Sequence, residues 1–439
     1  MSKKKYVLVG TGGRASMYIN ALTVDYTDVG ELMAFCDSNQ ARMDYWNSVM
    51  ESEYKAKALP TYKADQFDKM IADIKPDVVI ITSMDRTHHR YICRAMELGC
   101  DVITEKPMTV DAEKCQQIID TGKRTGKKVT VTFNYRYSPR NTKVKEVLKS
   151  GLVGDLTSIH FEWLLSTVHG ADYFRRWHRN KNNSGGLMVH KATHHFDLVN
   201  WWTGSFPETV YAMGDLLFYG KENAEKRGIT EFYYRAKGSK VAEKDPFALH
   251  VTKEDERLNG LYFGKPEEED NYYRDQSVFG DGISIEDNMG VMVRYRNKAI
   301  MTYSLNAHCP WEGYRVCFNG TKGRLEFNVV EAAYVSGDHA DFNQPGMHEL
   351  DCAKETMVPE IIFQPHWGKP QVIDYERAVG GHGGGDIRLL DHLFRGAGND
   401  PLGHSAGCLD GAKSILIGIA ANQSMKTGLP VAVESLVKF

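Results

Sequence analysis

Residues that could transfer protons or bind metal gather in one short segment. Residues 185–197, GGLMVHKATHHFD, contain His190, His194 and His195 together with Lys191. An imidazole titrates near neutral pH, so it can take the proton of a substrate hydroxyl, and it is also a common metal ligand. His190 and His194 are four residues apart, which places them on one face of a helix. His195 points about a hundred degrees away from His194. It can therefore be a buried hydrogen-bonding residue as readily as a residue of the site.

The residue between the two spaced histidines opposes a metal site. In the metalloprotease motif H-E-x-x-H a glutamate follows the first histidine, whereas Lys191 stands there in this chain, and its charge repels a cation. A third ligand would have to come from elsewhere in the chain, for example from His308 or His382. We therefore expect proton transfer and no metal ion.

A glycine-rich turn follows the first apolar run of the chain. It fits the pattern G-x-G-x-x-G/A and consists of Gly10, Thr11, Gly12, Gly13, Arg14 and Ala15. In this pattern the first glycine permits a tight turn, the second lets the backbone approach a pyrophosphate, and a helix N-terminus faces the anion. Asp37 ends the next predicted strand, where a carboxylate can bind the hydroxyls of the adenosine ribose. The turn therefore predicts a dinucleotide site.

Asp37 favours NAD as the cofactor because a carboxylate repels the 2′-phosphate of NADP. Ser38 and Asn39 follow it, so no adjacent arginine is available to pair with that phosphate. Arg14 and Arg42 could still bind it, and NADP remains an alternative.

Hydrophobic spacing predicts two domains that would position these residues. Between residues 1 and 135, helical patterns separate short apolar runs at 5–10, 31–37, 77–82, 100–107 and 128–134. This alternation predicts an α/β domain with a doubly wound parallel sheet of the Rossmann type.

Longer segments of alternating polarity follow within residues 136–439. They lie at 156–165, 208–219, 290–307 and 314–328 and predict a C-terminal α+β domain with a large, mostly antiparallel open sheet. A charged excursion of loops and short elements is expected at about 220–275. We assign substrate binding and oligomerisation to this second domain.

Composition narrows the class of protein. Of 439 residues, 42% are hydrophobic and 25% charged, and the net charge of −3 gives no electrostatic reason to bind nucleic acid or an anionic membrane. The sequence contains no apolar stretch of about 20 residues. None of the eight cysteines forms a C-x-x-C pair, and the N-terminal region lacks a signal-peptide pattern, so we expect reduced thiols and a cytoplasmic location.

Several motifs come in an order that resembles the Gfo/Idh/MocA family, which includes glucose–fructose oxidoreductase and inositol dehydrogenase. They are SMDRTHH (83–89), TEKPM (104–108), FNYRYSP (133–139) and the histidine-rich segment. The resemblance implies a Rossmann domain, a C-terminal α/β domain built on a large open sheet, and association as a homodimer or homotetramer. It also implies hydride transfer between a nicotinamide cofactor and a sugar, polyol or similar carbohydrate derivative.

Three catalytic residues follow from this resemblance. Lys106 matches the lysine of the family's EKP motif, at the end of a parallel strand, where its ammonium would stabilise a developing alkoxide. Closeness to an oxidised nicotinamide would favour a lowered lysine pKa. His194 matches the family's general base. His190 stands where the family more often has Asp, and we expect it to neighbour substrate hydroxyls or to relay the proton.

Further contacts are expected around these residues. For the cofactor, in addition to the glycine turn and Asp37, they are Ser83, His88, Glu105, Lys106 and Asn134. For the substrate they are Arg136, Trp177, Lys191 and Asp197. Each of three residues has an alternative role: His88 as a solvent-exposed histidine at a helix start, Arg136 as a structural residue, and Asp197 as a residue that orients His194 or packs against the first domain.

Two other functions remain open. The glycine-rich run GGHGGGD (380–386), expected as a turn before a helix, is reminiscent of a branch of the same family that cleaves glycosides with NAD by oxidation and elimination, although the other motifs of that branch are not found. A non-enzymatic nucleotide sensor is the second alternative, against which Lys106 and His194 argue. Residues 173–179, YFRRWHR, offer aromatic and cationic groups that suit a sugar.

Overall fold

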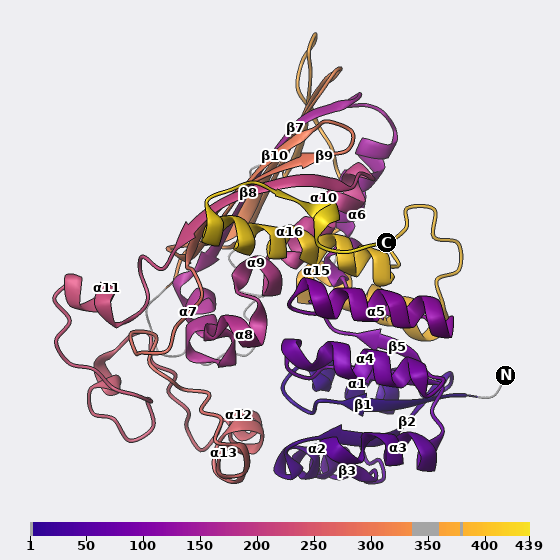
Figure 1. Ribbon diagram of the computed structural model, residues 1–439, viewed down its shortest axis with the longest axis vertical. Coiled ribbons are helices and arrows are strands. Elements are labelled where there is room, and N and C mark those ends of the chain that lie inside the picture. Colours follow the sequence, from indigo (N-terminus) through magenta and orange to yellow (C-terminus); the bar gives the residue numbers. More distant parts are fainter. Residues whose placement is uncertain (1–2, 336–359, 378–380) are drawn as a thin grey trace.

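The first domain contains the expected parallel sheet. The computed structural model describes residues 3–335, 360–377 and 381–439. Six parallel strands follow the order β3-β2-β1-β4-β5-β6 (Figure 1). Their bounds are β1 Lys4–Val9, β2 Gly30–Asp37, β3 Thr61–Lys63, β4 Val78–Ile81, β5 Asp101–Thr104 and β6 Val129–Val131. The order reverses between β1 and β4, so the carboxyl ends of these two strands open a crevice at the switch point. The predicted doubly wound α/β fold is confirmed.

Helices cover both faces of this sheet. They are α1 Ala15–Asn20, α2 Gln40–Ser52, α3 Phe67–Ile74, α4 His88–Glu97 and α5 Ala112–Thr125. Side-chain caps fix two of their starts, because Asn39 accepts a hydrogen bond from the Arg42 amide and Asp111 accepts one from the Lys114 amide.

The second sheet contains nine strands in the order β14-β13-β12-β11-β7-β10-β9-β8-β15. All neighbours are antiparallel except β7 and β10. Their bounds are β7 Leu156–Ser166, β8 Pro207–Asp215, β9 Asn288–Tyr295, β10 Ile300–Cys309, β11 Glu312–Gly320, β12 Gly323–Ala332, β13 Ile361–Pro365, β14 Gln371–Val372 and β15 Val431–Ala432. The expected large, mostly antiparallel sheet is confirmed.

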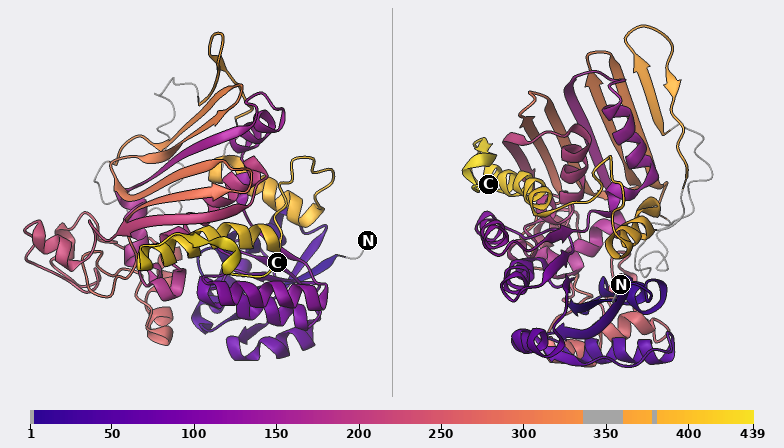
Figure 2. Two further views of the ribbon diagram at one scale, coloured as in Figure 1. Left: turned by 45° about the horizontal axis from the view of Figure 1, so that its top comes forward. Right: turned by 90° about the vertical axis from the view of Figure 1, so that its right-hand side faces the viewer.

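Helices lie between this sheet and the first domain (Figures 1 and 2). They include α6 Pro139–Lys149, α10 Thr193–Thr203, α15 Gly381–Arg395 and α16 Cys408–Thr427. Burial alternates along β9, with Met289 and Val291 buried and Met292 exposed on the opposite face. Helix α15 begins at Gly381, inside the glycine-rich run that we expected to form a turn.

One glycine brings α16 unusually close to α9 (Leu187–His190). A Cβ atom on Gly418 would lie 2.2 Å from the carbonyl oxygen of Met188, so the two helix backbones are in direct contact. Because Gly418 has no side chain, α16 can contact the backbone of α9, whose last residue, His190, accepts a hydrogen bond from Lys106 of the first domain.

The charged excursion crosses back to the first domain. It leaves the second sheet after β8 and contains α11 Lys221–Lys226, α12 Glu256–Tyr262 and α13 Lys265–Asp270. The last two helices lie beside α2 (Figure 1). Arg42 fastens them, because its Nε donates to the carbonyl oxygen of Leu261 at 2.9 Å and its Nη1 lies 2.7 Å from the Asp270 carboxylate.

The seven cysteines within the described residues are free thiols, and Cys352 lies outside them. The cytoplasmic location expected from reduced thiols stays a prediction. In the part of the chain that the structure describes, no helix combines the length and apolar character needed to span a bilayer.

Candidate active site

A cavity of about 810 Å³ lies between the glycine turn, the ends of β4 and β5, helices α9 and α10, and the excursion. It brings together most of the residues selected from the sequence. They are Gly10, Gly12, Gly13, Arg14, Asp37, Ser83, His88, Glu105, Lys106, Asn134, Trp177, His190, Lys191 and His194. The expected residues outside its lining are Thr11, Arg136 and Asp197.

The glycine turn has the backbone that the sequence pattern predicts. Gly10 has φ of +90°, and a Cβ atom there would lie 2.5 Å from the Cα atom of Ser83. The amide and hydroxyl of Thr11 donate to the Asp37 carboxylate at 2.5 and 2.9 Å, while Asn39 donates its amide to the other oxygen at 2.9 Å. Asp37 therefore ties the turn to the end of β2 and also lines the cavity.

Tyr262, which the sequence did not indicate, caps this turn from the excursion. Its hydroxyl oxygen accepts the Gly13 amide at 2.7 Å, and Arg257 Nη2 donates to the Gly13 carbonyl oxygen at 2.7 Å and to Ser16 Oγ at 2.8 Å. Amides at the start of a helix after such a turn bind phosphate oxygens. The Tyr262 hydroxyl oxygen occupies the position in which a phosphate oxygen would accept the Gly13 amide hydrogen. Tyr262 is 249 positions from Gly13, so no local sequence signal marks it.

Glu105 and Asn134 hold the wall beside the turn. The buried Glu105 carboxylate accepts from Arg14 Nε and from the Tyr18 hydroxyl, both at 2.7 Å. Burial opposes ionisation, but Arg14 outweighs it and lowers the pKa of Glu105. Asn134 Nδ2 donates to Asp386 at 2.6 Å, which links this wall to α15.

His88 fastens two loops rather than facing solvent. Its Nδ1 lies 2.8 Å from the carbonyl oxygen of Pro107 and its Nε2 lies 2.9 Å from that of Ser83. Burial lowers the pKa of this imidazole. The alternative of a solvent-exposed histidine is wrong, because the ring is almost completely buried between the ends of β4 and β5.

Lys106 reaches from the end of β5 to the second domain. Its Nζ donates to the carbonyl oxygen of His190 at 3.3 Å. Burial and the nearby Lys191 ammonium lower the pKa of Lys106 to about 8. The amine is therefore protonated at neutral pH and releases its proton just above it, a property that suits proton chemistry.

His190 is paired with Asp85, a carboxylate that follows β4. Its Nδ1 lies 2.5 Å from Asp85 Oδ2, and both residues are buried in the cavity wall. Burial raises the pKa of Asp85 and lowers that of His190. The imidazole and the carboxylate share one proton along this hydrogen bond. The pair can therefore take up or release a proton beside Lys106.

The histidine-rich segment is not one helix. Helix α9 ends at His190 and α10 begins at Thr193, with a turn between them, so His190 and His194 do not share the helix face that their spacing predicted. Within the described residues, no group of three or more His, Cys, Asp or Glu side chains is arranged to hold a metal ion. His308, considered as a third ligand, stacks on Phe218 instead, and the side chain of His382 lies outside the described part.

The two adjacent histidines of α10 have different surroundings. His194 lines the cavity and lies edge-on to Tyr135 and Phe133, with ring centroids 4.9 and 6.1 Å apart. His195 points into the core, where its Nδ1 lies 2.7 Å from the Tyr303 hydroxyl and its ring stacks on Trp163. The alternative of a buried hydrogen-bonding residue is confirmed for His195.

Arg136 and Asp197 form an ion pair with each other and do not line the cavity. The expectation that they contact the substrate is therefore corrected. Arg136 Nε and Nη2 donate to the two Asp197 oxygens at 2.7 and 2.6 Å, and Arg136 Nη1 donates to the Gly403 carbonyl oxygen at 3.2 Å. Both side chains are buried, so neither charge is left for a ligand. The structural alternative for Arg136 fits this position, where Asp197 is its partner.

We expect Tyr262→Phe to tighten dinucleotide binding about 5- to 10-fold, because the variant removes the hydroxyl that occupies the Gly13 amide, where a phosphate oxygen would accept. Isothermal titration calorimetry with NAD measures the dissociation constant. Tyr234→Phe, at an exposed position of the same excursion, is the matched control. Weaker binding by Tyr262→Phe would contradict this expectation and show that the hydroxyl donates to a bound phosphate.

Comparisons with known proteins agree with this architecture. Residues 4–133 match the model described as oxidoreductase family, NAD-binding Rossmann fold, and residues 145–433 match the oxidoreductase family's C-terminal alpha/beta domain. The chain is 36% identical over 451 residues to "Putative oxidoreductase YteT" of Bacillus subtilis (strain 168), an alignment that covers 99% of this chain and 98% of that protein.

Two more distant proteins share parts of this likeness. D-glucoside 3-dehydrogenase of Escherichia coli (strain K12) is 29% identical over 126 residues, which cover 29% of this chain and 34% of that enzyme. The crystal structure of the WlbA dehydrogenase from Bordetella pertussis, in complex with NADH and UDP-GlcNAcA, superposes with a TM-score of 0.63 at 16% identity over 98% of this chain and 99% of that one. The matches to both domains show that the chain belongs to the Gfo/Idh/MocA family of oxidoreductases.

Proposed function

We propose that the protein is an NAD-dependent dehydrogenase that oxidises a hydroxyl-bearing carbon of a sugar, polyol or glycoside. The observation that carries this proposal is that Lys106, His194 and the His190–Asp85 pair line the same cavity as the glycine turn. The turn fits a dinucleotide, since Gly10 has the positive φ that this tight turn requires and Asp37 lines the cavity beside it. Sugar and inositol dehydrogenases among the relatives support a carbohydrate substrate.

Each residue has a defined part in this reaction. When bound, a nicotinamide dinucleotide supplies the acceptor for the hydride that leaves the substrate carbon. His194 takes the proton of the hydroxyl on that carbon as the O–H bond breaks. The Lys106 ammonium stabilises the negative charge that develops on the oxygen.

The surrounding groups tune and complete the site. The Lys191 ammonium contributes to the lowered pKa of Lys106 and lies over the Trp163 ring, 4.9 Å from its centroid. The His190–Asp85 pair provides a second proton site next to the reacting oxygen. Trp177 lines the cavity while stacked on His178, so its indole offers an apolar surface to a sugar ring.

A panel of sugars and glycosides tests this function by NADH absorbance together with product chromatography. Formation of NADH in step with an oxidised sugar supports the dehydrogenase. Release of a free aglycone without net NADH would instead support redox-neutral glycoside cleavage. The excursion favours that second function in one respect, because Arg257 contacts the Gly13 carbonyl oxygen and Ser16 Oγ beside the turn, and a segment held there would retain a bound cofactor through a complete cycle.

We expect Lys106→Ala and His194→Ala each to reduce turnover about 10²-fold or more, because they remove the charge stabiliser and the base. His190→Ala should reduce it by only about 10-fold if His190 relays a proton. Steady-state kinetics and NAD titration measure both effects, and NAD affinity should change little. A larger loss in His190→Ala than in His194→Ala would transfer the role of base to His190.

The lowered pKa of Lys106 predicts the pH dependence of carbonyl reduction with NADH. The ammonium form is needed to stabilise the oxygen, so the rate should fall as the pH rises through about 8. Lys106→Arg keeps its charge to much higher pH and should lose this descending limb. A rate that rises through the same pH range would show that neutral Lys106 is the active form.

We expect NAD to bind at least about 10-fold more tightly than NADP. Asp37 lines the cavity, and the two arginines that could hold a 2′-phosphate already have acceptors: Arg14 binds Glu105, and Arg42 binds Asp270. Calorimetry with both cofactors measures the preference. Equal affinities would show that one of these arginines leaves its partner for the phosphate.

We infer a homodimer or homotetramer that associates through the open face of the nine-stranded sheet. Met213, Met292 and Ile300 lie on that face of three adjacent strands and are 65%, 51% and 39% exposed. Light scattering should therefore give at least twice the 49.6 kDa chain mass. Met292→Glu should shift the mass toward the monomer, and a monomeric parent protein would exclude this association.

A further inference from the structure

Positive charge is concentrated in the cavity. Its lining contains ten Lys and Arg residues but only five Asp and Glu residues. In the whole chain the two kinds nearly balance, with 54 Lys and Arg residues and 57 Asp and Glu residues. The phosphates of a dinucleotide would offset only part of this excess. A cavity of one charge attracts ligands of the opposite charge, because its low-dielectric walls focus the field.

The excess is greatest around Asp172, a cavity residue on α7 (Thr167–Arg175). Three guanidinium groups surround this one carboxylate: Arg274 Nη2 at 2.7 Å, Arg176 Nη1 at 3.0 Å and Arg175 Nη2 at 3.4 Å. Together they lower the pKa of Asp172 in spite of its burial. A single carboxylate neutralises one of these charges, so the cluster retains a net positive charge.

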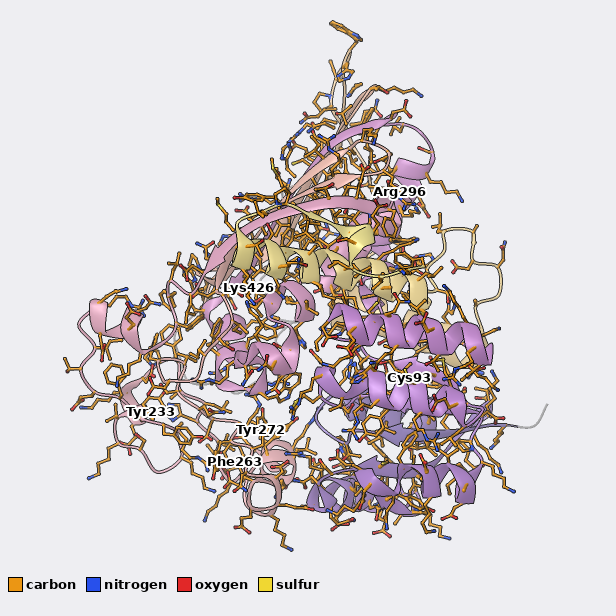
Figure 3. All side chains as sticks on the ribbon, in the orientation of Figure 1. Cys93, Tyr233, Phe263, Tyr272, Arg296 and Lys426 are labelled. Carbon is orange, nitrogen blue, oxygen red and sulfur yellow. The ribbon has the colours of Figure 1, made fainter. Side chains whose placement is uncertain are left out.

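Several hydrogen-bonding atoms in this cluster have no partner within the described residues. They are Arg176 Nε, Arg274 Nη1, the Tyr272 hydroxyl and His178 Nδ1, all of which are buried and belong to residues that line the cavity. Tyr272 lies on the side of the excursion that faces the first domain (Figure 3). Buried polar atoms are nearly always paired, so an unpaired set beside a cavity indicates a ligand.

This cluster adjoins the proposed chemistry. Burial raises the pKa of Asp85, and the positive charges of Lys106 and Arg176 oppose that shift. Burial and Lys106 lower the pKa of His190, and Arg176 contributes to the same effect. The segment that carries Arg176 also touches His190 directly, because the rings of His178 and His190 lie 4.2 Å apart between centroids.

We propose that the substrate is a sugar derivative with a carboxylate or phosphate group, and that Arg176 and Arg274 bind this group through the donors that Asp172 leaves unpaired. The proposal rests on the proposed function, whose substrate it narrows from carbohydrates in general to anionic ones. Guanidinium groups suit either anion because they bind two oxygens of a planar or tetrahedral group at once. Trp177, two residues from Arg175, would then contact the apolar face of the same sugar.

The phosphates of the dinucleotide are the competing occupant of this cluster. These phosphates have an expected site elsewhere, at the Gly13 amide, because turns of this kind bind a phosphate there. Arg257 lies beside that site and adds a positive charge to it. Arg176, in contrast, lies two residues from His178, whose ring is 4.2 Å from that of His190, and this position beside the His190–Asp85 pair favours the substrate.

Kinetics of the NAD-loaded protein with three matched compounds test the proposal. They are a hexuronate, the hexose 6-phosphate and the neutral hexose of the same configuration. We expect one of the anionic compounds to exceed the neutral one in kcat/KM by about 10-fold or more, mainly through KM, and the preferred compound distinguishes a carboxylate from a phosphate. Equal or better use of the neutral hexose would overturn the proposal while leaving the dehydrogenase function intact.

Arg274→Gln and Arg176→Gln then locate the anion. Each should raise the KM for the preferred anionic sugar about 10-fold and leave the KM for the neutral hexose and the affinity for NAD nearly unchanged. Weakened NAD binding with an unchanged KM for the anionic sugar would overturn the proposal, because the arginines would then hold the cofactor. Asp172 keeps two guanidinium partners in either variant, so if one variant fails to fold, the other decides.

Arg296→Gln is the matched control, because Arg296 is exposed on the second domain, far from the excursion (Figure 3). If no compound transfers hydride, the dehydrogenase function fails, and calorimetry with the hexuronate and the hexose 6-phosphate decides the anion site separately. Binding of either compound that is lost in Arg274→Gln supports the site, and absence of binding by the parent protein overturns it.

Discussion

The hydrogen bond from Lys106 Nζ to the carbonyl oxygen of His190 joins the two domains at the point where their chemistry meets. Lys106 follows β5 of the parallel sheet, and His190 ends a short helix of the second domain. The bond holds the half-buried Lys106 side chain against the second domain, and burial there is the main reason why its pKa is lowered to about 8. The lowered pKa of this lysine is therefore a property of the contact between domains, because neither domain alone would bury it.

The second domain maintains that contact by close packing. Gly418 allows α16 to lie directly on the backbone of α9, and α16 also packs against α5 of the first domain. The same helices bring His194 and Lys191 to the cavity. A movement of α9 away from α16 would leave an unfilled space between the two helices, which is unfavourable. Their packing therefore keeps the carbonyl oxygen of His190 within hydrogen-bonding distance of Lys106.

The excursion adds a third wall and two of the ten cationic residues that line this cavity, Arg257 and Arg274. Tyr262 and Arg257 contact the glycine turn, while Tyr272 and Arg274 contribute to the cluster around Asp172. One segment of the second domain therefore touches both the expected cofactor turn and the expected substrate region. A movement of the excursion would therefore change the surroundings of the glycine turn and of Asp172 together.

The sequence by itself determined the elements and the residues whose chemistry is local. Continuous apolar runs predicted the strands of the first sheet except β3, and alternating polarity predicted those of the second sheet except the short β13, β14 and β15, because strands buried on both faces are apolar throughout and strands buried on one face alternate. The glycine turn and Asp37 were likewise predictable, since a tight turn at a helix start requires particular residues at fixed spacing. Motif order also selected Lys106 and His194, both of which line the cavity.

Only the tertiary structure decided which side chains pair. Asp85 meets His190 across 105 positions and Tyr262 meets Gly13 across 249, and no local pattern encodes such contacts. Tertiary packing also turned Arg136 and Asp197 toward each other and divided the histidine-rich segment into two helices. The physical reason is that pairing and pKa depend on burial between distant segments, whereas periodicity and turn geometry depend on neighbours along the chain.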